Sequence, residues 1–299
     1  MQIEVAKKQL IKYGEELCGD TAEVLRTQDR TVVVLADGLG SGVKANILST
    51  LTAKILVTML ADGADVKDTV ETVVSTLPVC AERGVAYSTF SVLTVHHDGN
   101  AHLLEFDNPE MVLVRRGELV KLEKTVMEMD GKAISECRFR LEEGDMCVMF
   151  SDGVVHAGVG KLLNLGWRYA SAADFVRRSC QRTTTPHQMA GILARACQYL
   201  YMGKPGDDTT CLAIQARKEQ PYTVMIGPPL EEGKDVELVE TLLSAPGKKI
   251  VCGGTTSSIV SRMTGNPIQV ELPSISPNIP PWGRMQGGDL VTEGVVTIT

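Results

Sequence analysis

Acidic residues at the ends of strongly apolar segments are the part of this sequence most able to do chemistry. Asp37 follows the run TVVVLA, Asp152 follows MCVMFS, and Asp207 with Asp208 precedes TTCLAI. Carboxylates at strand ends, beside glycines that let backbone carbonyls approach, are the ligands that Mg²⁺ and Mn²⁺ require. A lone Asp-Gly is more often a turn, as we expect at Asp62, so the interpretation depends on the three sites together.

The segments that must position these aspartates predict an α+β domain. Residues 31–36 predict a buried strand, and the apolar spacing from Val43 to Met59 predicts a helix with one apolar face. A second helix is expected over residues 66–77. Short apolar segments alternate with turn residues across 88–150, which is typical of an antiparallel meander. Paired helices beside antiparallel strands favour α+β layering over an alternating parallel sheet.

Two later helices have recognisable start signals. Ser171 and Asp174 fit a capping box, and Thr185 followed by Pro186 combines an N-cap with proline at the first helical position. A last strand is expected at residues 211–216. It follows the aspartate pair directly, so that pair should lie at a strand end.

We expect two domains, residues 1–218 and residues 222–299, because a polar tract with a proline interrupts the pattern between them. The pattern of the second expected domain, residues 222–299, predicts a small α/β unit. It runs to the last residue without a terminating signal, so we expect it to be truncated from a longer protein.

The segment Gly253-Gly254-Thr255-Thr256 joins a strand to a helix in this unit. Such a loop can present free backbone N–H groups to an anion. It lacks the lysine of a P-loop, and a helix cap formed by Thr255 or Ser257 is the favoured interpretation. A dimerisation or sensor role for the unit, with a possible homodimer, is a further alternative.

Composition excludes several classes of function. The net charge of -7 and the pI near 5.4 provide no basic field for nucleic acid. No uninterrupted apolar run reaches the ~18 residues of a membrane span, and the N-terminus does not resemble a signal peptide. We therefore expect a cytoplasmic protein without a membrane partner. The eight cysteines form no C-x-x-C pair, which predicts reduced thiols, with Cys147 and Cys211 in the core.

Five motifs in order resemble the PPM (protein phosphatase 2C-like) superfamily, and specifically its bacterial SpoIIE branch. The resemblance covers roughly residues 10 to 218. It implies the PPM phosphatase fold, a central antiparallel β-sandwich flanked by α-helix layers. The motifs that carry it are Cys18-Gly19-Asp20, ADGLGSG from Ala36 to Gly42, Asn108-Pro109, LEEGD from Leu141 leading to FSDGV from Phe150, and Gly206-Asp207-Asp208-Thr209-Thr210.

The resemblance also implies roles for individual residues. Asp37 would bridge two Mn²⁺ or Mg²⁺ ions, the Gly38 carbonyl would contribute to one of them, and Asp152 and Asp207 would complete the other. Asp20 and Asp208 would lie close by, ligating through water or orienting the ligands. Asp37, Asp152 and Asp207 would thus be the catalytic residues, and a metal-bridging hydroxide would attack phosphorus in line.

The implied activity is that of a metal-dependent phosphoserine/phosphothreonine protein phosphatase in bacterial signalling. Its substrate would be a phosphorylated regulatory protein, of which a STAS-type anti-sigma antagonist is one kind. A non-catalytic PPM-fold binding or sensor module, and nucleotide or phosphometabolite sensing through the Gly-Gly-Thr-Thr loop, are the alternatives. His156 stands where related phosphatases often have an acidic residue; a surface histidine is the favoured interpretation, and a proton donor the other.

Overall fold

The computed structural model describes residues 1–76, 88–129, 132–182, 185–231, 233–271 and 282–294. The chain divides into two compact units, Met1–Lys218 and Glu219–Thr299. Each unit has its own sheet system and its own buried core.

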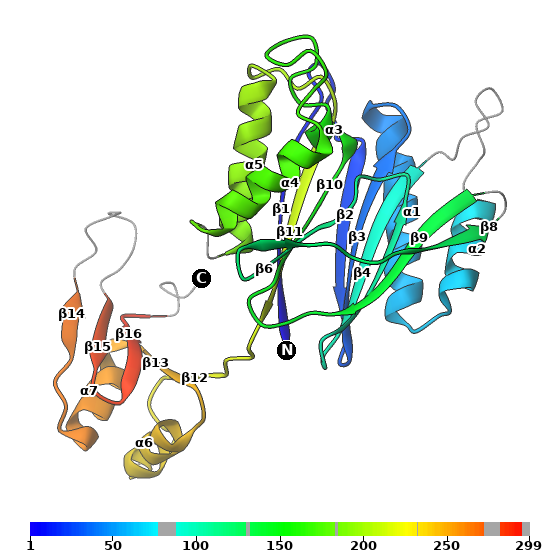
Figure 1. The fold of residues 1–299 in the computed structure, drawn as a ribbon. Coiled ribbons are helices and arrows are strands. Elements are labelled where there is room, and N and C mark those ends of the chain that lie inside the picture. Colours follow the sequence, from blue (N-terminus) through cyan, green and yellow to red (C-terminus); the bar gives the residue numbers. More distant parts are fainter. Residues whose placement is uncertain (77–87, 130–131, 183–184, 232, 272–281, 295–299) are drawn as a thin grey trace. The chain divides into compact units, whose positions relative to one another are not determined.

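The first unit contains two antiparallel sheets (Figure 1). The six-stranded sheet has the order β2 (Asp20–Arg26), β3 (Arg30–Gly38), β4 (Ser88–His96), β5 (Asn100–Phe106), β9 (Lys132–Arg140), β8 (Thr125–Met129). The five-stranded sheet has the order β1 (Gln2–Leu10), β11 (Thr209–Arg217), β10 (Met146–Phe150), β6 (Val112–Arg115), β7 (Glu118–Val120). Side chains from both sheets, among them Leu35, Leu93, Met149 and Leu212, form one buried cluster between them. The expected β-sandwich is therefore confirmed.

Helices cover the outer face of each sheet. Helices α1 (Gly42–Ala61) and α2 (Val66–Thr76) pack on the six-stranded sheet. Helices α3 (Asp152–Val155), α4 (Tyr169–Cys180) and α5 (Pro186–Leu200) pack on the five-stranded sheet. The second helix was expected to end at residue 77, which lies outside the described residues.

The apolar spacing of α1 gave a partly wrong prediction of its buried face. Val43, Ile47 and Leu51 are exposed, because the helix turns a different face to the sheet. That face includes the small residues Ala45 and Ala53, which allow a close approach to β3. By length and composition α1 would pass as a membrane span, as core helices of soluble proteins also do, and 44% of its most apolar window is buried.

Of the two predicted helix starts, one is confirmed and the other is wrong. Thr185 caps α5 as expected: its hydroxyl accepts a hydrogen bond from the Gln188 N–H, and Pro186 is the first helical residue. The capping box at Ser171 was wrong. Helix α4 already begins at Tyr169 because Arg168, with φ of 62°, provides the turn into it.

In the second unit, β12 (Tyr222–Ile226), β13 (Lys248–Cys252) and β16 (Gly288–Thr292) are parallel neighbours. Strand β15 (Trp282–Met285) pairs antiparallel with β16, and β14 (Gln269–Glu271) pairs antiparallel with β15 at the edge of the sheet. Helices α6 (Asp235–Ser244) and α7 (Gly254–Thr264) share a core with the sheet that includes Val239, Val260 and Val291.

Cys147 and Cys211 are completely buried, as expected. Within the described part of the chain every cysteine is a free thiol; Cys80 lies outside it.

Candidate active site

The β2–β3 ladder brings the first two site residues together. Its register pairs Asp20 directly with Asp37. The register is fixed by the residues from Val32 to Ala36, which are almost completely inaccessible to solvent, since a slip of one residue would turn each side chain to the other face. Asp37 is thus held at the end of a strand whose position is set by the core.

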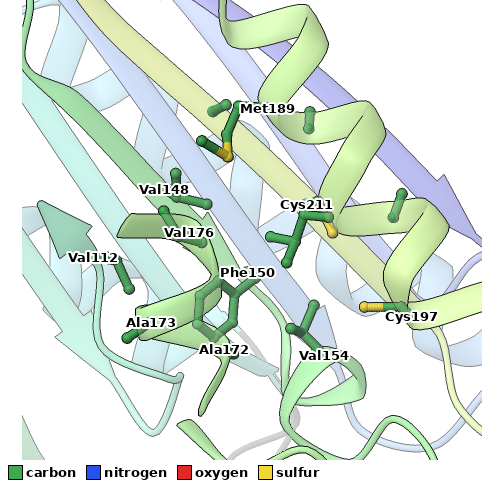
Figure 2. Packing of buried hydrophobic residues seen from close by; sticks show 14 of the residues in the cluster. Val112, Val148, Phe150, Val154, Ala172, Ala173, Val176, Met189, Cys197 and Cys211 are labelled. Atoms are coloured by element: carbon green, nitrogen blue, oxygen red, sulfur yellow. The ribbon is translucent and has the colours of Figure 1, made fainter. Parts of the chain in front are cut away.

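The five-stranded sheet supplies the remaining carboxylates. Asp152 is the first residue of α3, directly after β10, and Asp207 and Asp208 directly precede β11. Strands β10 and β11 are neighbours, with Phe150 paired to Cys211. Phe150 anchors this end of β10, because its ring is buried in the cluster under α4 (Figure 2).

Ser151 connects the two sheets at this edge. Its hydroxyl donates to Asp20 Oδ2 at 2.7 Å and accepts from the Thr210 N–H at 2.9 Å. Ser151 has no exposed surface. The buried bridge brings the carboxylate of β2 to the strand ends that carry Asp152 and Asp208.

Two glycines allow backbone to approach the site closely. A Cβ on Gly38 would lie 2.0 Å from the Ala45 carbonyl oxygen of α1, and one on Gly153 would lie 2.0 Å from the Asp208 carbonyl oxygen. Neither position has room for a side chain. The Asp-Gly pairs at 37 and 152 are therefore packed against neighbouring backbone.

Burial and mutual repulsion change the acidity of the carboxyl groups. Burial, together with the charges of Asp20, Asp152 and Asp207, raises the pKa of Asp37 to about 9. Burial also raises the pKa of Asp20 to about 6, against the opposing hydrogen bond from Ser151. The pKa of Asp207 is raised as well, first by burial and then by the charge of Asp152. The negative charges at this edge are thus under-compensated.

Two carboxylate oxygens at the edge, Asp20 Oδ1 and Asp208 Oδ2, are buried without a hydrogen-bond partner among the described residues. Unpaired buried oxygens of this kind call for a cation or a donor. Lys12 gives limited compensation: its N–H bonds Asp208 Oδ1 at 3.0 Å, and its ammonium lies 3.7 Å from Asp207. The all-oxygen donor set therefore fits a hard divalent cation.

Across the described ranges, no three His, Cys, Asp or Glu side chains already form a metal-binding group. The chain segments that carry the aspartates meet at this edge, although their side chains do not form such a group in this structure. The roles expected for Asp20, Asp37, Asp152, Asp207 and Asp208 as metal ligands therefore stay predictions.

Comparison with known proteins identifies the family. Residues 27–217, more than half of the chain, match the model of the family described as Stage II sporulation protein E (SpoIIE). The chain belongs to the SpoIIE family. It is 23% identical over 229 residues to Stage II sporulation protein E of Bacillus subtilis (strain 168), an alignment that covers 73% of this chain and 26% of that relative.

Two solved structures have a similar fold. One contains the PP2C phosphatase domain and a fragment of the regulatory domain of SpoIIE from Bacillus subtilis, with a TM-score of 0.62 and 20% identity, covering 74% of this chain and 63% of that one. The other is RsbX in complex with magnesium, with a TM-score of 0.52 and 19% identity, covering 71% and 94%. The PPM phosphatase fold is thereby confirmed. This SpoIIE-family chain spans about a quarter of the length of its curated relative.

His156 and Asn108 lie beside the carboxylates of the SpoIIE-family chain. His156 Nε2 is 3.9 Å from Asp152 Oδ2, and more than half of its side chain is exposed. Both residues line an open groove of about 630 Å³, together with Asp107, Glu110 and Asp152. Asn108 is held by hydrogen bonds to Ser91 and Thr89.

Sequence reasoning missed some supporting residues of this SpoIIE-family site. Ser151 lies inside the Ser-Asp-Gly motif, which was a usable signal. Tyr201, whose hydroxyl donates to the Gly153 carbonyl at 2.7 Å, and Gln9, whose amide donates to the Asp20 carbonyl at 3.2 Å, had no such signal. Both contacts join segments far apart in the sequence.

Proposed function

We propose that this chain is a metal-dependent protein phosphatase that hydrolyses phosphoserine or phosphothreonine. The observation that carries the proposal is the pair of buried, unpartnered oxygens on Asp20 and Asp208, at the edge where the segments that carry the five aspartates meet. A scaffold without cations has no electrostatic reason to keep these repelling groups buried together. The same observation disfavours a non-catalytic module.

Asp37, the Gly38 carbonyl, Asp152 and Asp207 would hold two divalent cations, with Asp20 and Asp208 beside them. Bound Mn²⁺ or Mg²⁺ would neutralise phosphate oxygens and lower the pKa of a water molecule toward neutrality. The similar fold of RsbX, solved in complex with magnesium, supports this choice of ion.

The chain's own residues bind and orient the reactants. Ser151 fixes one oxygen of Asp20, and Tyr201 fixes the backbone of Gly153, so that the carboxylates stay at the edge of the sheets. The groove beside Asp152 is open, as access for a segment of a protein substrate requires. These contacts contribute through positioning.

Cys18 lies near the cluster but is unsuited to act as the nucleophile. Burial and the charge of Asp20 raise the pKa of its thiol to about 12, so the thiolate is scarce at neutral pH. A covalent phosphocysteine route is therefore disfavoured, which leaves direct attack by water on phosphorus.

The substrate we propose is a phosphorylated regulatory protein of bacterial signalling, with a STAS-type anti-sigma antagonist as one kind. The protein would act in the cytoplasm. The family membership supports this assignment.

The test is hydrolysis of p-nitrophenyl phosphate and of a phosphoserine peptide, with Mn²⁺, with EDTA, and with Asp37→Asn. We expect turnover only with metal and only in the unsubstituted chain. Asp62→Asn, the same change at an exposed Asp-Gly turn after α1, is the matched control and should be fully active. Hydrolysis that persists both in EDTA and in Asp37→Asn would overturn the proposal.

A further inference from the structure

Helix α7 in the second unit begins without a side-chain cap. Its N-cap residue is Gly253, with φ of 102°, and no side chain accepts a hydrogen bond from the first turn. The cap expected from Thr255 or Ser257 was therefore wrong. Ser257 instead donates its hydroxyl to the Gly254 carbonyl at 2.9 Å. The first helical hydrogen bond runs from the Ser257 N–H to the Gly253 carbonyl, which leaves the three preceding N–H groups of the helix without intrahelical partners.

Thr256 provides a second, independent feature at the same place. The residue is 1% exposed, and among the described residues its hydroxyl has no hydrogen-bond partner. A Cβ on Gly253 would lie 3.5 Å from Thr256 Oγ1, so this hydroxyl faces the N-cap of the helix. Thr256 Oγ1 is not among the fully buried oxygens that lack a partner, so the hydroxyl keeps a small opening to solvent through which a ligand at the helix N-terminus can reach it.

The edge of the sheet next to α7 has the layout of a ligand site. Parallel strands β12, β13 and β16 end in register, with Ile226 paired to Cys252 and Cys252 paired to Thr292. A Cβ on Gly254 would meet no atom of the described residues within 4 Å, so the first helical residue has open space beside it. Ligands of open α/β sheets bind outside the carboxyl ends of such strands.

Glu293 indicates which chemical group the ligand carries besides its phosphate. It directly follows β16 and is exposed, and the preceding Thr292 carbonyl accepts the Gly253 N–H at 2.8 Å. An acidic residue at the end of the strand beside a phosphate-binding turn is placed to accept hydrogen bonds from sugar hydroxyls.

We propose that the second unit binds a nucleoside phosphate. The free N–H groups of Gly254, Thr255 and Thr256 and the Thr256 hydroxyl bind the phosphate, and Glu293 binds the ribose. The site lies outside the phosphatase residues and is independent of their activity.

The first experiment is calorimetric titration of the full chain with AMP, ADP and ATP in EDTA, which prevents metal-dependent binding at the aspartate cluster. We expect saturable binding of at least one nucleotide. Thr256→Val should weaken it by about tenfold, because a hydrogen bond to a charged group is lost. Thr241→Val in α6, whose hydroxyl donates to the Glu237 carbonyl, is the matched control and should bind normally.

Loss of binding in Thr256→Val is separable from unfolding and from loss of phosphatase activity. The Thr256 hydroxyl bonds no described residue, so its replacement by a methyl group of similar shape should leave the ligand-free melting temperature unchanged. Metal-dependent phosphatase turnover of this variant should equal that of the unsubstituted chain.

The second experiment compares AMP with 2′,3′-dideoxy-AMP. Glu293→Gln should weaken AMP binding and abolish the preference for the ribose hydroxyls. Equal weakening of both ligands would overturn the ribose assignment. The absence of saturable binding to any nucleotide up to ~10 mM, or equal affinities of Thr256→Val and Thr241→Val, would overturn the site itself.

Discussion

Asp20 and Asp37 face each other as a directly opposed pair in the β2–β3 ladder. Like charges in this position destabilise a sheet. Both carboxyl groups have raised pKa values. The pKa of Asp37 is raised to about 9 and that of Asp20 to about 6, with burial the largest cause for both. Without metal, folding therefore works against the ionised form of Asp37.

The first prediction follows from the raised pKa of Asp37. Between its unfolded value of ~3.9 and the folded value of about 9, the folded chain holds a proton that the unfolded chain has lost. The metal-free chain should therefore lose stability as pH rises through this window, by at most about 1.4 kcal/mol per pH unit from this group. Asp37→Asn should be more stable than the unsubstituted chain at pH 8, and its free energy of unfolding should change less with pH.

Urea unfolding in EDTA at pH 5, 7 and 8.5 measures this difference. Asp62→Asn controls for the loss of one carboxylate at the surface and should keep the original pH dependence. Parallel stability curves for Asp37→Asn and the unsubstituted chain would show that Asp37 ionises freely in the folded state.

The second prediction concerns metal addition. A cation that binds only the folded chain stabilises it by about 2.7 kcal/mol at a hundredfold excess over its Kd. Mn²⁺ should therefore raise the melting temperature, and more at pH 8 than at pH 6, because deprotonated carboxylates bind it. The shift should be absent in Asp37→Asn, and an equal shift in that variant would mean that the ion binds elsewhere.

The sequence predicted the segments near the site better than the contacts that hold them. The run before Asp37 and the pair before β11 were recognisable, because apolar runs ending in Asp identify strand ends without knowledge of the partner strand. The Asp20–Asp37 pairing and the Tyr201 contact depend on tertiary structure, and Tyr201 is 48 residues from Gly153. The exposed face of α1 was mispredicted because that helix is apolar on two sides, so spacing alone could not choose between them.

The third prediction tests His156. Its side chain is more than half exposed, and the 3.9 Å between its ring nitrogen and Asp152 Oδ2 is too long for a hydrogen bond that would hold it for proton transfer. His156→Gln should therefore change turnover of p-nitrophenyl phosphate and of a phosphoserine peptide by less than about threefold. A loss of ~10²-fold confined to the peptide, whose seryl leaving group needs a proton, would instead identify a general acid.

The fourth prediction concerns the contact between α3 and the loop residue Asp208, which directly precedes β11. Gly153→Ala would place a methyl group 2.0 Å from the Asp208 carbonyl, so one of the two backbones must move. We expect loss of metal-dependent activity by more than tenfold. Gly206→Ala, where a Cβ would meet the Tyr201 ring at 3.4 Å, is the control and should retain most activity; comparable activities would refute the packing argument.

The last prediction assigns Ser151 a positioning role. Ser151→Ala removes a donor to Asp20 and an acceptor for the Thr210 N–H, at a cost of about 1–3 kcal/mol in stability. Ser88→Ala is the matched control, because the buried Ser88 hydroxyl bonds, within the described part of the chain, the backbone carbonyls of Asp37 and Thr89 and no carboxylate. Both changes should lower the melting temperature.

Only Ser151→Ala should raise the Mn²⁺ concentration for half-maximal activity, by about tenfold, since it leaves the Asp20 carboxylate unoriented. Excess Mn²⁺ should then recover most of the turnover, with the KM for p-nitrophenyl phosphate little changed. A purely structural role would affect both variants in proportion to their stability. The same Mn²⁺ requirement in the two variants would therefore contradict the link between Ser151 and the metal ligands.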